Sequence, residues 1–83
     1  GTEAFPTVAE KAAVLLQGIL IAHPFMDGNK RAGVGAMLSF LELNGVELTA
    51  PEDPLYDFVI AVTTGELREV HGIAQQIRQL FSL

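Results

Sequence analysis

The residues with the greatest chemical potential lie together in one short stretch, 22-AHPFMDGNKRAG-33. The stretch holds a histidine, a carboxylate, an asparagine and two adjacent cations, directly before a predicted helix. The first four backbone amides of a helix have no acceptor within the helix, and the helix dipole adds partial positive charge there. A phosphate group fits such a position. The stretch therefore predicts an anion site at the start of a helix.

Four residues of this stretch suit the phosphates of a nucleotide. We expect Gly28 to let the backbone close around an oxyanion. Asn29 can donate to a phosphate oxygen while it caps the helix. Arg31 offers a planar fork for phosphate oxygens, and Lys30 offers a compact charge on a flexible stem. Together they predict a phosphate-binding site.

Three further residues extend this prediction from binding to catalysis. Asp27 is the only carboxylate of the stretch and suits a Mg²⁺ ion that bridges to the phosphates. His23 is the residue able to accept a proton near neutral pH, which makes it the candidate base for an incoming hydroxyl. Phe25, between polar neighbours, is expected to point inward and anchor the loop. The combination predicts phosphoryl or nucleotidyl transfer from a nucleoside triphosphate to a hydroxyl.

Each feature has a simpler interpretation when it is taken alone. A lone histidine is commonly a capping or surface residue, an Asp-Gly pair is a common turn, and two adjacent cations are commonly a solvated pair. A metal pair formed by His23 and Asp27 would need a continuous helix, which Pro24 and Gly28 interrupt. Residues 27–29 lack the later ligands of a calcium loop. Because all these residue types arrive together at a helix start, we favour the nucleotide site.

The elements that must position this stretch are predicted to be helices. Thr7 and Glu10 form a Thr-x-x-Glu capping box, and apolar residues follow at helical spacing until the helix stops before Pro24. A loop is expected over residues 23–28. Further helices are predicted over residues 29–44, 55–64 and 67–81, with a connector over 46–54 and stops at Gly45 and Gly65. No segment alternates with a period of two, so the fold class is all-α, a bundle of about four helices.

Composition limits the kinds of protein that this chain can be. Its 83 residues make one domain, 1–83, and 49% of them are hydrophobic, with a mean hydropathy of +0.36. This surplus suggests packed helices with an apolar face left for another segment or a partner. The lack of cysteine favours a reducing cytoplasmic compartment, and no apolar run reaches the ~20 residues of a membrane span. The net charge of −5 argues against a nucleic-acid surface and a DNA-binding helix-turn-helix.

The segment 23-HPFMDGNKR-31 resembles the signature of the Fic/Doc superfamily, His-Pro-Phe-x-Asp/Glu-Gly-Asn-Gly/Lys-Arg, at every specified position. The segments 7-TVAEKAAVLLQGI-19, 40-FLELNGVEL-48 and 61-AVTTGEL-67 resemble the Doc (death-on-curing) branch. The resemblance implies a compact helical bundle with the motif loop at a helix N-terminus.

The resemblance also implies a role for each residue of the motif. His23 would be the general base, Asp27 would hold Mg²⁺, and Phe25 would fix the loop. The phosphate-binding residues would be those at the helix start: Gly28, Asn29, Lys30 and Arg31. The substrate implied is ATP.

Two departures decide which reaction the resemblance favours. Fic adenylyltransferases carry Gly at the position of Lys30 and a second Arg at the position of Val34. Lys30 matches the Doc pattern, which implies transfer of the γ-phosphoryl group. Gly28 is closer to the Fic proteins, because Doc proteins tend to carry Ala there. We therefore expect a Doc-type kinase, with AMP transfer as the alternative.

The same resemblance implies partners for the chain. A Doc-type toxin belongs to a toxin–antitoxin system and phosphorylates a translation factor, with elongation factor Tu as the expected target. Thr7 is followed four residues later by Lys11, so the self-inhibitory pattern of the superfamily is missing and a separate antitoxin is expected. The chain corresponds to the C-terminal portion of a Fic/Doc domain. A non-catalytic antitoxin-binding module or fragment is therefore the alternative from another class.

Overall fold

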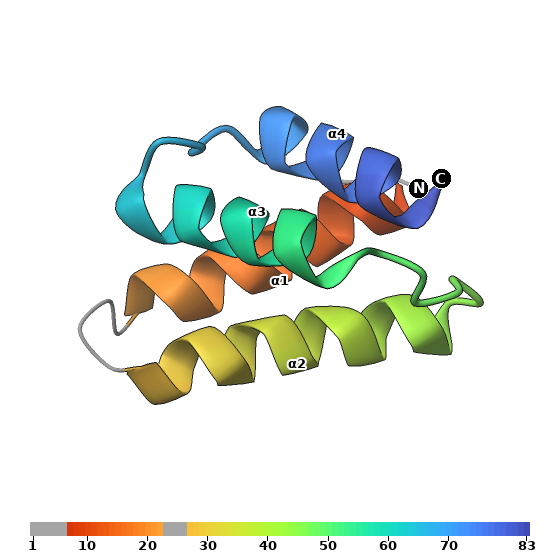
Figure 1. The fold of residues 1–83 in the computed structure, drawn as a ribbon, viewed down its shortest axis with the longest axis horizontal. Coiled ribbons are helices and arrows are strands. Elements are labelled where there is room, and N and C mark those ends of the chain that lie inside the picture. The colour runs from red at the N-terminus through yellow and green to blue at the C-terminus, as the bar shows by residue number, and fades with distance from the viewer. Residues whose placement is uncertain (1–6, 23–26) are drawn as a thin grey trace.

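Four helices, connected in an up-and-down order, make up the described part of the chain. The computed structural model describes the backbone of residues 7–22 and 27–83 and the side chains of residues 7–21 and 30–83. The helices are α1 (Val8–Ala22), α2 (Asp27–Leu43), α3 (Glu52–Thr64) and α4 (Val70–Phe81), and no strand occurs within these ranges. The end of α1, the start of α2 and the end of α3 lie at the same end of the bundle (Figure 1). The predicted all-α fold is confirmed.

The start of α1 follows from its capping residue. The backbone N–H of Glu10 donates to Thr7 Oγ1 at 3.1 Å, as the sequence predicts. The Glu10 side chain has an additional partner from α4. Arg78 Nη2 lies 3.6 Å from Glu10 Oε1 and donates to Thr7 Oγ1 at 3.3 Å. One guanidinium therefore ties the start of α1 to the last turn of α4.

Helix α1 is the centre of the bundle, because it contacts each of the other three helices. Its strongest packing is against α2 on one side and α4 on the other. The largest fully buried side chains come from these three helices and are Leu16, Met37, Leu41, Ile73 and Ile77. Burial of each stabilises the fold by about 2 kcal/mol. Helix α3 completes the core through Phe58, Val59 and Val62.

A glycine permits the close approach of α1 and α2. A Cβ atom on Gly33 would lie 3.2 Å from Leu20 Cδ2 and 3.4 Å from Leu16 Cδ1. Gly35 lies on the opposite side of α2, where a Cβ would meet nothing within 4 Å. Of these two glycines, Gly33 is the one that the close packing of α1 and α2 requires.

The C-terminal end of α2 is the predicted one. Gly45 adopts φ +81°, and its N–H donates to the Glu42 carbonyl at 3.0 Å. The Val46 N–H donates to the Leu41 carbonyl at 3.0 Å. These two bonds satisfy carbonyls that the helix leaves open, in the manner of a Schellman motif. The left-handed stop at Asn44-Gly45 is confirmed.

The starts of α3 and α4 differ from the predicted ones. Helix α3 begins at Glu52, before the predicted Leu55, because Pro54 is tolerated in a first turn, where its missing N–H has no acceptor. Helix α4 begins at Val70 rather than Leu67. The Leu67 N–H donates to the Ala61 carbonyl, and the Arg68 carbonyl accepts from Gln17 Nε2. These bonds hold residues 66–69 outside the helix.

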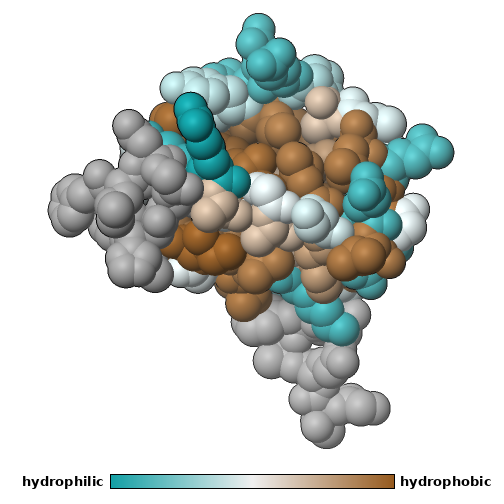
Figure 2. Space-filling model, turned by 90° about the horizontal axis from the view of Figure 1, so that it is seen from below, coloured by the Kyte–Doolittle hydropathy of each residue, from teal (hydrophilic) through white to brown (hydrophobic). Residues whose placement is uncertain are grey.

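The outer face of α2 carries few charges. Figure 2, which looks onto this side of the bundle, shows a largely hydrophobic surface. Exposed positions of α2 between Arg31 and Glu42 include Ala32, Gly35 and Ser39. None of the helices in the described part of the chain is long and apolar enough to cross a membrane.

Candidate functional site

The candidate site begins at the first turn of α2. The helix starts at Asp27, so the backbone of Asp27 and Gly28 belongs to the first turn and not to the loop that the sequence predicts. The helix thus begins two residues earlier than predicted, so the backbone amides without an acceptor within the helix begin at Asp27. The structure describes only the backbone of residues 27–29, so the contacts predicted for Asp27, Gly28 and Asn29 remain predictions.

Two residues of the predicted site lie in the segment that connects α1 to α2. His23 and Phe25 are outside the described residues. The proposed base and the proposed loop anchor therefore stay predictions from the sequence. The second histidine of the chain, His71, is exposed on α4.

Lys30 and Arg31 lie beside one side of α3. They line a groove of about 500 Å³ between α2 and α3, with Val34 as the third residue from α2. Lys30 is half-buried and Arg31 is exposed. The wall formed by α3 is mostly apolar and consists of Glu52, Leu55, Tyr56, Val59 and Ile60. The groove thus joins two cations at a helix start to an apolar slot.

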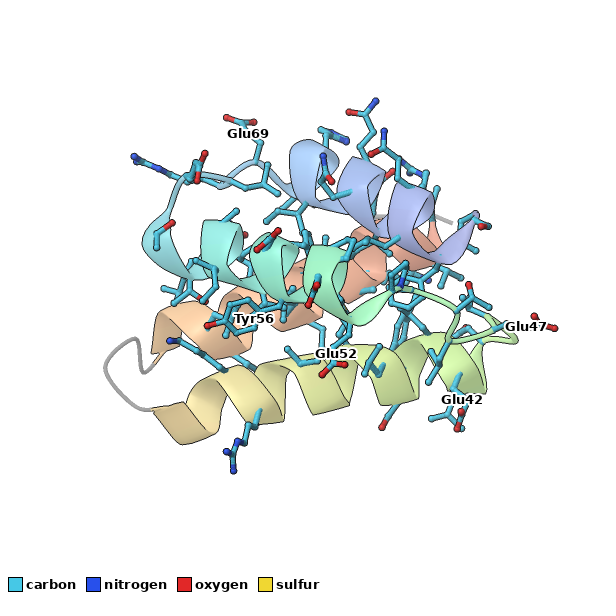
Figure 3. All side chains as sticks on the ribbon, in the orientation of Figure 1. Glu42, Glu47, Glu52, Tyr56 and Glu69 are labelled. Carbon is cyan, nitrogen blue, oxygen red and sulfur yellow. The ribbon has the colours of Figure 1, made fainter. Side chains whose placement is uncertain are left out.

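Tyr56 and Glu52 give this groove its remaining polar groups. Tyr56 is 65% exposed, and its side chain points toward the end of the bundle at which α2 begins (Figure 3). Glu52 comes from the first turn of α3, a favourable place for a carboxylate, because the helix dipole is positive there. A flat apolar group could lie along the groove beside Tyr56, with a negatively charged group near Lys30 and Arg31.

The residues of α3 were not among the predicted site residues. The sequence motif ends at Arg31, so it contains no residue of α3. Tyr56 is the single tyrosine of the chain and lies on the exposed side of an amphipathic helix. An exposed aromatic residue at such a position is the one signal that could have pointed to it.

No group of three or more histidine, aspartate and glutamate side chains gathers as a metal site among the described residues. The predicted magnesium ligand, Asp27, is outside that set. The magnesium prediction therefore rests on the chemistry of the motif.

Comparison with known proteins matches the chain to a family. The model of the Fic/DOC family matches residues 1–41, which include α1, the connecting segment and most of α2. This is the part of the chain that holds the whole motif. No solved structure gave a significant match.

Two curated relatives have names that refer to Doc. "Toxin Doc" of Mycolicibacterium smegmatis (strain ATCC 700084 / mc(2)155) is 45% identical over 53 residues, covering 64% of this chain and 41% of that protein. "Protein kinase doc" of Escherichia phage P1 is 36% identical over 73 residues, covering 87% of this chain and 56% of that protein. The chain thus spans about half the length of these relatives.

The family match covers the whole motif, whose residues 27–31 form the start of α2. Residues 1–41, which hold the motif, are therefore similar to the Fic/DOC family, and the two curated relatives are of the Doc type.

Proposed function

We propose that this chain is the nucleotide-binding part of a Doc-type toxin, a kinase that transfers the γ-phosphoryl group of ATP to a hydroxyl of a protein. The proposal rests on the groove between α2 and α3. Lys30 and Arg31 line it at the start of a helix, and an apolar wall continues from them along α3. A triphosphate needs cations and unpaired amides, and a nucleobase needs an apolar slot. The groove supplies both in one place.

The nucleotide would lie with its phosphates at the first turn of α2 and its base along α3. Lys30 and Arg31 neutralise phosphate charge, and backbone amides from Asp27 onward donate to phosphate oxygens. Tyr56 stacks on the base at the exposed rim of the groove. The half-buried setting of Lys30 favours its charge–phosphate contact, because screening by water is reduced there.

The chemical step follows from the residue types of the motif. The acceptor oxygen forms a bond to the γ-phosphorus, the bond from that phosphorus to the bridging β–γ oxygen breaks, and ADP leaves. His23 accepts the proton of the hydroxyl. Asp27, the carboxylate of the first turn, would hold Mg²⁺. That ion supplies charge neutralisation on the phosphates when it is bound.

The partners of this function are also part of the proposal. The acceptor is a hydroxyl of a translation factor, with elongation factor Tu as the first candidate. An antitoxin protein restrains the toxin, and both act in the cytoplasm. The names of the two relatives support a toxin and a kinase, and Lys30 matches the Doc pattern of the motif.

Labelled ATP tests the reaction. The purified chain is incubated with elongation factor Tu and with ATP labelled at either the α or the γ phosphate. We expect label on the target from γ-labelled ATP alone. Label from the α position alone would contradict the kinase and support AMP transfer.

His23→Ala separates catalysis from binding. We expect the variant to lose transfer by at least about a hundredfold, because a general base contributes that much or more. It should bind ATP as the unchanged chain does, since Lys30 and Arg31 remain. Label transfer that persists in this variant would contradict the role of His23. Absence of both transfer and ATP binding in the unchanged chain would support the antitoxin-binding alternative.

A further inference from the structure

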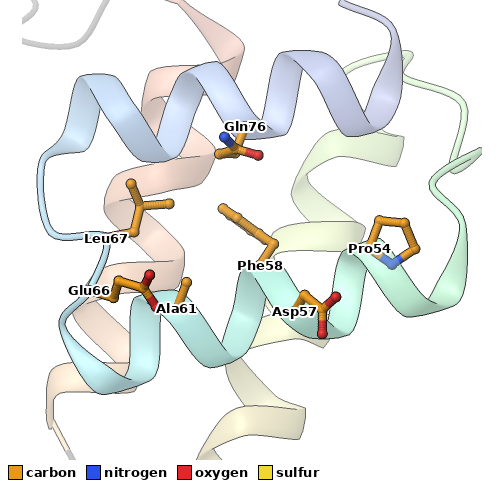
Figure 4. A pocket seen from close by; sticks show the side chains of 7 residues that line it. All are labelled: Pro54, Asp57, Phe58, Ala61, Glu66, Leu67 and Gln76. Carbon is orange, nitrogen blue, oxygen red and sulfur yellow. The ribbon is translucent and has the colours of Figure 1, made fainter.

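A second groove lies on the other side of α3, between α3 and α4. Its volume is about 470 Å³, and Figure 4 shows the residues that line it. Phe58 extends from α3 toward α4 and forms the floor, where it is 4% exposed. Leu67, from the connector between the two helices, closes one end of the groove. The groove therefore has an apolar floor, and its rim is open to solvent.

Gly72 helps to form this groove. A Cβ atom on Gly72 would lie 3.2 Å from Leu67 Cδ1. The lack of a side chain there lets Leu67 lie against the first turn of α4. The connector is held in place by the bond from the Leu67 N–H to the Ala61 carbonyl. The apolar end wall is thus part of the folded structure.

The rim of the groove is acidic. Asp57 and Glu66 line it, Gln76 faces them from α4, and no lysine or arginine is among its lining residues. All three side chains are exposed. Within the described part of the chain, no hydrogen bond or ion pair engages the carboxylates of Asp57 and Glu66 or the amide of Gln76. The groove thus presents two carboxylates and an amide to a ligand above an apolar floor.

We propose that this groove binds a basic amphipathic segment of a partner protein. An apolar side chain of that segment covers Phe58 and Leu67, and a lysine or arginine lies between Asp57 and Glu66. Charge complementarity decides the occupant, since a neutral or acidic segment would leave both carboxylates without a counter-charge. A volume of this size admits a few side chains from one face of a helix. The surface is separate from the nucleotide groove and does not depend on the proposed function.

A peptide titration of the ¹⁵N-labelled chain tests the proposal. The probe is a 14-residue helical peptide of leucine and lysine with one apolar face. We expect amide shifts at Asp57, Glu66, Leu67 and Gln76. A matched peptide with glutamate in place of lysine should cause no shifts at these residues. Shifts caused equally by both peptides would overturn the charge argument.

Paired variants locate the interaction. The double variant D57N/E66Q should weaken binding of the lysine peptide by about tenfold, since two charge pairs are lost. The control, E42Q/E47Q, removes two exposed carboxylates at the far end of the bundle (Figure 3) and should change the affinity by less than about twofold. Circular dichroism checks that both variants fold.

Three results would overturn the proposal. Equal weakening by the two double variants would indicate general charge attraction. Binding of the lysine peptide with shifts confined to other residues would place the site elsewhere. Concentration-dependent self-association that shifts the same amides without any peptide would show that a second copy of the chain occupies the groove.

Discussion

At the scale of single residues, Tyr56 is one of the residues of the candidate site that lie outside the sequence motif. It lies on α3, in the same groove as Lys30 and Arg31. The Tyr56 side chain is 65% exposed, so it contributes little to the core. The proposed role of the ring is therefore to hold the base of the nucleotide.

Substitution of Tyr56 should separate base binding from phosphate binding. Tyr56→Ala is expected to weaken ATP binding by about tenfold, because an aromatic ring stacked on a base contributes about 1–3 kcal/mol. Tyr56→Phe should keep most of the affinity. Isothermal titration calorimetry with ATP measures base and phosphate binding together, and titration with inorganic tripolyphosphate measures phosphate binding alone. An equal loss for ATP and tripolyphosphate in Tyr56→Ala would contradict stacking on the base.

Gly33 and Gly35 of α2 make a matched pair at this scale. Gly33→Ala adds a methyl group between α2 and the buried Leu16 and Leu20. Overpacking costs about 1–3 kcal/mol and the gain in helix propensity offsets about 1, so we expect a net loss of about 1 kcal/mol. Gly35→Ala meets nothing and should gain about 0.5–1 kcal/mol. Urea denaturation measures both, and stabilisation by Gly33→Ala would contradict the close packing described here.

At the scale of helices, the start of α1 and the end of α4 are stabilised as one unit. Thr7 Oγ1 accepts from the Glu10 N–H and from Arg78, and Arg78 also approaches the Glu10 carboxylate. Arg78 is 37% exposed, so its ion pair alone contributes little. The helix cap is the stronger part of this arrangement.

Thr7→Ala should therefore lower the free energy of unfolding by about 1 kcal/mol, the usual contribution of an N-cap side chain. Thr7→Ser keeps the hydroxyl oxygen and should change the free energy of unfolding by at most about a few tenths of a kcal/mol. Urea denaturation of the two variants gives the comparison. If the alanine and serine variants were equally stable, the cap at Thr7 would contribute nothing to the fold.

At the scale of the whole molecule, the chain is acidic, with ten carboxylates against five cations. Arg68 Nε donates to the Gly65 carbonyl and Arg78 lies beside Glu10, so neither belongs to a basic surface. Lys30 and Arg31 are adjacent to each other in the nucleotide groove. The two adjacent cations of the sequence therefore lie together in one groove.

We expect this arrangement to exclude binding to duplex DNA. A DNA-binding surface neutralises several phosphates at once, and five cations scattered over an acidic chain cannot do so. Fluorescence anisotropy with a labelled duplex at about 150 mM salt should give no binding below about 10⁻⁴ M. ATP binding under the same conditions is the positive control. Duplex binding tighter than this limit would contradict the assignment of the motif to nucleotide alone.

The sequence by itself determined the features that depend on neighbouring residues. Thr7 caps α1 and Gly45 ends α2, because both signals act within one turn of a helix. Helical spacing was enough for the all-α class, and the motif was enough for the resemblance to the Fic/DOC family. The roles of His23 and Asp27 also come from the motif and remain predictions.

The tertiary structure alone decided which segments meet at the site. Tyr56 and Lys30 are 26 positions apart in the sequence but line the same groove. Arg78 and Thr7 are 71 positions apart but form a hydrogen bond. Both pairs meet because the other helices pack onto α1. The start of α4 was also decided this way, since the bonds of Leu67 and Arg68 to other helices remove residues 66–69 from it. Local signals set where a helix can begin or end, whereas a groove between helices depends on how their buried faces fit.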